Sequence, residues 1–120
     1  MRKLLLLLPL LFLLGSCDDV TYVERVVLVN PTDYQVLVDV KGAADSSWQG
    51  LGIAKRQSET LVQEVIDQGD TWIFRFSYVG EAAGEDRISR SSLMRERWRY
   101  QIPERIGELL KEKGYAPSVG

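Results

Sequence analysis

Apolar and polar residues alternate with a period of two along most of the chain. Val36, Val38 and Val40 occupy every second position of residues 34–41, which is typical of a strand with one buried face. Every second residue from Trp72 to Tyr78 is aromatic, so we expect that stripe to lie in the core. The pattern predicts strands at residues 25–29, 34–41, 48–53, 59–66, 71–78, 85–90 and 97–102.

Residues that favour turns separate these strands. Asn30-Pro31-Thr32-Asp33 and Asp67-Gln68-Gly69-Asp70 suit tight turns, and residues 80–84 form a predicted loop. Six or seven short strands with regular turns predict a mostly β fold, namely a small antiparallel β-sandwich of immunoglobulin-like architecture. A small open barrel is the alternative. In residues 59–66 we expect Val62 and Ile66 on one face and Leu61 and Val65 on the other.

The period changes near the C-terminus. Ile106, Leu109 and Leu110 recur at helical spacing, and they predict a short α-helix over residues 103–113. Proline is tolerated at the start of a helix, and a glycine at position 114 ends it. We expect residues 117–120 to fray.

The N-terminus has the order of a secretory signal. Arg2 and Lys3 give a positive start, residues 4–14 are apolar, and Gly15 and Ser16 are small. The apolar run is too short to cross a bilayer, which takes about 20 helical residues. We therefore treat residues 1–16 as a targeting segment and exclude them from the fold.

The only cysteine follows this segment directly. Leu14-Gly15-Ser16-Cys17 resembles the lipobox of bacterial lipoprotein precursors. The resemblance implies that Leu14, Gly15 and Ser16 are recognised by a signal peptidase, which cuts before Cys17. It also implies that the Cys17 thiol carries a diacylglyceryl group. Such a group is consistent with a stable anchor, since two acyl chains hold a protein to a membrane where one does so only marginally.

This interpretation divides the chain into three parts. Residues 1–16 are the signal peptide, residues 17–22 are the lipidated cysteine with a short tether, and residues 23–116 are one β-domain with its C-terminal helix. Loss of Arg2 and Lys3 leaves 13 basic and 17 acidic side chains, a net charge of −4. A net negative charge argues against nucleic-acid binding.

Side chains for catalysis are scarce. The chain has no histidine, which is the usual general base and a common zinc ligand, and lipidation would occupy its one thiol. We expect no enzyme activity, no metal site and no cofactor. A hydrolase that works without histidine is the third alternative.

Arginines concentrate in residues 87–105. The segment contains Arg90, Arg95, Arg97 and Arg99, interleaved near its end with Trp98 and Tyr100. Its acidic residues are only Glu96 and Glu104. Such a surface suits anionic lipid headgroups or an acidic partner. Alternation with inward residues also explains it as a solvated outer face, which we favour.

These observations predict a membrane-anchored lipoprotein on the extracytoplasmic face of the cell membrane. We expect the domain to be a non-catalytic interaction or accessory module that contacts an envelope protein or polymer. The alternative is a lipoprotein that binds a small ligand or a carbohydrate through Trp48 and the loops at residues 43–52 and 80–84.

Overall fold

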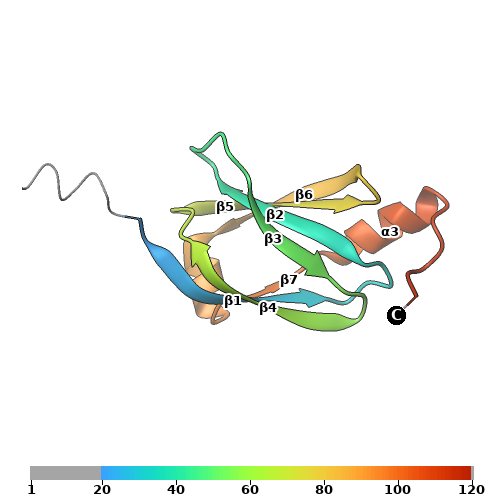
Figure 1. Cartoon of the computed structure of the whole chain (residues 1–120), viewed down its shortest axis with the longest axis horizontal. Helices are drawn as coiled ribbons and strands as arrows, with labels where there is room; N and C mark the ends of the chain where they lie inside the picture. Colours follow the sequence, from blue (N-terminus) through green and yellow to red (C-terminus); the bar gives the residue numbers. More distant parts are fainter. Residues whose placement is uncertain (1–19, 120) are drawn as a thin grey trace, which may run out of the picture.

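The computed structural model describes residues 20–119, which form two β-sheets and two helices (Figure 1). The expected signal peptide, the lipobox and Cys17 lie outside this range. No helix within residues 20–119 is long and apolar enough to cross a membrane. The strands are β1 (Tyr22–Asn30), β2 (Val36–Gly42), β3 (Gln49–Ala54), β4 (Ser58–Ile66), β5 (Thr71–Tyr78), β6 (Glu81–Ser89) and β7 (Arg99–Gln101), and the helices are α2 (Arg90–Arg95) and α3 (Glu104–Glu112).

The two sheets confirm the predicted sandwich. One sheet has the order β4-β1-β7 and the other has the order β3-β2-β5-β6. The strand order is similar to that of an immunoglobulin domain, in which β1 would correspond to the second strand and would have the first strand beside it. In this chain the strand at that position beside β1 is β7. It comes from the C-terminal part of the chain and runs parallel to β1.

The core lies between the sheets, as the alternation predicts. Val36, Val38 and Val40 are at most 1% exposed, and Trp72 and Phe74 are fully buried. Burial of each large apolar side chain contributes about 1.5–3 kcal/mol. The aromatic face of β5 is therefore a packing surface, although its last residue is only half-buried. A stacked pair crosses the core, because the Phe74 and Tyr100 ring centroids are 3.8 Å apart.

Strand β4 does not keep its predicted alternation. Val65 is fully buried and Ile66 is exposed, although the period of two places Ile66 with Val62. The cause is Glu64, whose φ of 53° interrupts the extended backbone. The alternation in β1 is interrupted at the same place, where Glu24 and Arg25 are both exposed. Val23 therefore stays in the core, paired with Val65.

The segment from residue 79 to residue 90 also differs from prediction. Residues 80–84 are not a loop, because β6 begins at Glu81. Val79 and Gly80 alone join β5 to β6, with φ values of 49° and 80°. Positive φ at both central residues is the geometry that suits the twist of a two-residue hairpin.

Helix α2 was not predicted, and β7 is shorter than expected. The Ser89 hydroxyl caps α2 by accepting a hydrogen bond from the backbone N–H of Ser92. Arg97 and Trp98 then adopt consecutive positive φ values of 55° and 63°, and β7 begins only after them, at Arg99. The predicted strand at residues 97–102 is therefore reduced to β7.

Helix α3 confirms the predicted C-terminal helix. Pro103 is its N-cap, and Gly114 follows its end with a φ of 91°. Ile106 and Leu110 are buried on its inner side. The Arg105 guanidinium donates a hydrogen bond to the Glu85 carbonyl at 2.7 Å, so the helix is also tied to β6.

The strand directions give the sandwich two distinct ends (Figure 1). We call one the α2 end, because α2 lies there with the start of β1 and the loops at residues 43–48 and 67–70. We call the other the α3 end, because α3 lies there with the β1–β2 turn, the β5–β6 hairpin and the C-terminal tail.

Candidate functional site

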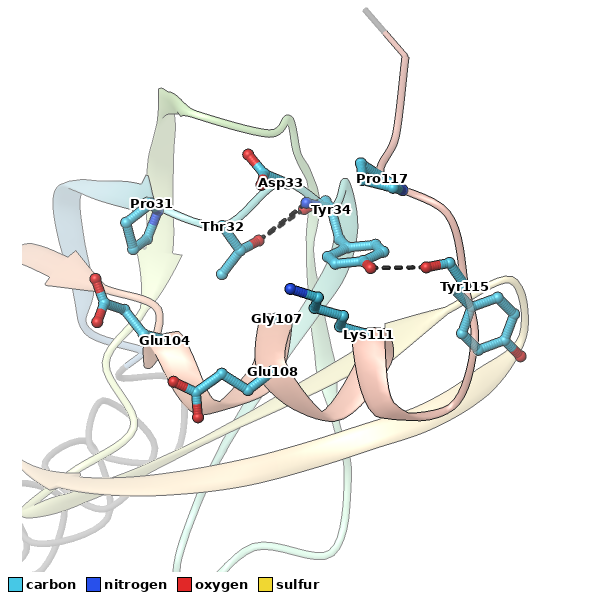
Figure 2. A pocket seen from close by; sticks show the side chains of 10 residues that line it. All are labelled: Pro31, Thr32, Asp33, Tyr34, Glu104, Gly107, Glu108, Lys111, Tyr115 and Pro117. Atoms are coloured by element: carbon cyan, nitrogen blue, oxygen red, sulfur yellow. Dashed lines mark hydrogen bonds between the residues drawn. The ribbon is translucent and has the colours of Figure 1, made fainter.

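A groove of about 460 Å³ lies at the α3 end, between the β1–β2 turn, helix α3 and the C-terminal tail (Figure 2). The turn forms one wall, one face of α3 forms the other, and the tail closes one end. Its lining residues are Pro31, Thr32, Asp33, Tyr34, Glu104, Gly107, Glu108, Lys111, Tyr115 and Pro117.

The turn wall is fixed by the buried side chain of Asn30. Its amide N–H groups donate to the carbonyls of Tyr34 at 2.8 Å and Ala54 at 3.0 Å. Its amide oxygen accepts from the backbone N–H of Thr32 at 2.9 Å and from the Thr32 hydroxyl at 2.7 Å. A buried amide with all its partners in place holds one conformation of a turn, because each broken bond leaves a desolvated polar group.

The helix wall approaches the turn at a glycine. A Cβ atom at Gly107 would lie 2.9 Å from the Cβ of Thr32 and 3.1 Å from its Cγ2. Only a glycine allows this contact without displacement, so Gly107 sets the distance between α3 and the turn. Glu104, Glu108 and Lys111 are exposed, and they stand along the groove on the helix side (Figure 2).

The C-terminal tail is tied across the turn. The Tyr34 hydroxyl donates to the carbonyl of Tyr115 at 2.7 Å. The backbone N–H of Ser118 donates to the Asp33 carbonyl at 2.8 Å, and its hydroxyl accepts from the N–H of Gln35 at 2.9 Å. These two hydrogen bonds tie Ser118 to the β1–β2 turn, within the segment 117–120 that was expected to fray.

The Tyr115 side chain adds a second tie on the other side of the tail. Its hydroxyl donates a hydrogen bond to the Glu81 carboxylate, and this bond raises the pKa of the Tyr115 phenol. The ring also packs edge-on against Tyr78, with 4.9 Å between the ring centroids.

This arrangement is suited to binding. The amide and hydroxyl groups of Asn30 and Thr32 are used in internal bonds, so the groove offers shape, proline and tyrosine surface, and charges at its rim. Asp33, Glu104 and Glu108 are acidic and Lys111 is basic. Among residues 20–119, no three His, Cys, Asp or Glu side chains are grouped closely enough to hold a metal ion.

Two of the four arginines singled out from the sequence are engaged in ion pairs. Arg90 binds Asp67 through Nε and Nη2, the latter at 2.8 Å. Burial by itself raises the pKa of the Asp67 carboxyl, but hydrogen bonds from Arg90 and Gly69 outweigh it and the pKa falls below its usual range. Arg99 forms two hydrogen bonds with Glu59, which lower the pKa of that carboxyl.

The other two arginines are exposed at or next to α2. Arg95 lies in α2 and donates to the Ser92 hydroxyl at 3.0 Å, and Arg97 lies in the turn that follows. The structure therefore gathers Arg90 and Arg95 on α2 and separates them from Arg99 on β7.

The residues proposed for a small-ligand site do not converge. Trp48 is half-buried, and two cations lie over its ring. The guanidinium carbon of Arg75 is 4.1 Å and the Nζ of Lys41 is 5.1 Å from the ring centroid. Its loop, residues 43–48, lies at the α2 end, whereas the β5–β6 hairpin lies at the α3 end (Figure 1). A single pocket cannot use both.

The sequence pattern did not reveal the groove. A glycine inside the amphipathic helix, at position 107, is the signal that indicates close packing there. Comparison of the chain with protein-family models, with curated proteins and with solved structures gives no significant match.

Proposed function

We propose that the chain is an extracytoplasmic bacterial lipoprotein, anchored in the membrane through Cys17, whose domain is a non-catalytic interaction module of the cell envelope. The observation that carries the anchor is the sequence Leu14-Gly15-Ser16-Cys17 behind a basic start and an apolar run. Two acyl chains on one cysteine give stable attachment without a membrane-spanning helix.

The geometry of the domain supports a module that presents its groove away from the bilayer. Strand β1 begins at Tyr22, so the five residues after Cys17 reach at most about 18 Å. The α2 end must then stay near the anchor. Strand β1 has 9 residues, so the α3 end lies about 30 Å farther from it.

The anchor is tested by metabolic labelling with a fatty acid that carries an alkyne. We expect the label on the wild-type chain and its loss in Cys17→Ser. Ser16→Ala is the matched control, because alanine is another small residue beside the cysteine, and this variant should keep the label. Label that persists in Cys17→Ser, or that is absent from the wild type, contradicts the anchor.

The groove is tested by photo-crosslinking in living cells. A photoreactive amino acid at Lys111, on the rim of the groove, should give a discrete crosslinked species. The same amino acid at Gln63, which is exposed on the outer face of β4, is the control and should give none. Identical patterns at the two positions, or no species at Lys111, would count against the groove as the contact surface.

A small-ligand or carbohydrate carrier is the second candidate. The groove volume of about 460 Å³ favours it, because ligand pockets usually measure about 300–1,000 Å³. Native mass spectrometry of the purified chain distinguishes the two. A bound small molecule together with no crosslink at Lys111 would move the carrier ahead of the interaction module.

A further inference from the structure

Four large apolar side chains are exposed together at the α2 end. Val20, Tyr22, Ile66 and Met94 are 55%, 56%, 39% and 52% exposed. We call them the α2-end patch. Exposed apolar side chains that gather in one place indicate an interaction surface, whereas scattered ones do not.

The four side chains are linked through neighbouring positions, with Arg90 between Ile66 and Met94. Tyr22 and Ile66 are cross-strand partners in β1 and β4. Val20 and Ile66 line one hollow together with Arg90. The Arg90 guanidinium in turn lies 3.1 Å from the sulfur of Met94, so α2 joins the patch to the start of β1.

The charges around the patch do not favour one sign. Arg90, the central cation, is neutralised by Asp67, whose side chain is 13% exposed. Arg95 and Arg97 are exposed, but so are Glu64 and Asp70. The patch is therefore recognisable by its apolar surface and not by a net positive charge.

We propose that the α2-end patch rests on the bilayer surface, at the boundary between headgroups and acyl chains. This inference depends on the proposed lipid anchor at Cys17. Val20 is the third residue after Cys17, a reach of about 11 Å at most, so the patch cannot leave the neighbourhood of the lipid. Tyrosine suits this boundary because its ring is apolar and its hydroxyl polar, and the arginine stem can lie along apolar surface with its charge in water.

The experiment is spin-label accessibility on the full lipidated chain in phosphatidylcholine vesicles. A nitroxide at Met94→Cys reports on the patch, and one at Ile66→Cys repeats the measurement on β4. Val79→Cys is the control at the α3 end, where the native side chain is 79% exposed. Ile53→Cys, 51% exposed on β3, is a control matched in exposure to Met94.

We expect vesicles to reduce access of a water-soluble nickel reagent to the labels at positions 94 and 66, and to leave positions 53 and 79 unchanged. The reduction in access at positions 94 and 66 should be the same when part of the phosphatidylcholine is replaced by anionic phosphatidylglycerol. Protection that appears only with the anionic lipid would overturn an apolar contact.

The outcomes also separate this inference from the proposed function. If the chain floats with the vesicles while position 94 remains as accessible as position 79, the patch proposal is wrong and the anchor stands. If the chain does not float, or if Cys17 itself takes the label, the anchor is wrong and the patch proposal falls with it.

Discussion

The two ends of the sandwich differ in whether their polar groups are paired and their apolar side chains buried. At the α3 end, Asn30 and Thr32 satisfy each other, and Gly107 brings a helix against them. At the α2 end, apolar side chains such as Tyr22 and Met94 stand in solvent, and one ion pair joins α2 to the loop at residues 67–70. The α3 end is built to keep a shape, whereas the α2 end keeps a surface that a neighbour can cover.

The largest expected effect is at the centre of the α3 end. Asn30→Ala removes a partner of the Tyr34 and Ala54 carbonyls and of the Thr32 N–H, all in or beside the β1–β2 turn. Unpaired buried groups cost about 1–3 kcal/mol each, so we expect a loss of about 3 kcal/mol or more in the free energy of unfolding. Urea denaturation measures it, with Gln35→Ala as an exposed control in the same turn region. A loss below that of the control would contradict a turn fixed by Asn30.

The next effect is at the contact between α3 and the turn. Gly107→Ala places a methyl group 2.9 Å from the Cβ of Thr32, whose side chain is buried and hydrogen-bonded. Alanine favours a helix by about 1 kcal/mol over glycine, but overpacking costs about 1–3 kcal/mol. We expect a net loss of stability and a displaced α3.

The exposed helix position Glu108 supplies the control for that prediction. Glu108→Ala should change the free energy of unfolding by less than about 0.5 kcal/mol, because surface substitutions rarely do more. If Gly107→Ala stabilises the protein instead, the helix and the turn are not in the close contact described.

A smaller effect is expected at the ion pair of the α2 end. Asp67→Asn should lower the free energy of unfolding by about 1 kcal/mol, since surface ion pairs of good geometry contribute up to that amount. The pKa of Asp67 is lowered in the folded state, so its contribution is present above the unfolded pKa of about 3.9 and is lost as the pH falls below it. Denaturation of wild type and Asp67→Asn at several pH values should converge in acid. A difference that grows as the pH falls would contradict this assignment.

The smallest effect is expected for the exposed residues Arg95 and Arg97. Arg95→Ala and Arg97→Ala should change the free energy of unfolding by less than about 0.5 kcal/mol, because both side chains are exposed. The protection of the label at Met94→Cys by vesicles should also be unchanged. Loss of that protection in either variant would assign the membrane contact to these cations and not to apolar side chains.

The sequence predicted what depends on local alternation. The period of two identified the core faces of β2 and β5, and Pro103 with Gly114 bounded α3. The period of two gave the wrong prediction at Glu64, Arg97 and Trp98, which adopt positive φ. None of these residue types indicates that conformation in the sequence.

The candidate site could not be predicted for a different reason. Gly107 and Thr32 are far apart in the sequence, and their contact exists only once α3 packs across the β1–β2 turn. The α2-end patch likewise depends on a six-residue helix that brings Met94 beside Arg90 and the start of β1. Periodicity identifies faces within an element, but it does not show which elements meet.

Intact-mass spectrometry of the native product tests the central claim most directly. The account predicts a chain that begins at Cys17 and carries the added mass of its acyl groups. A chain that retains Met1, or one that begins at Cys17 without the acyl mass, would contradict it.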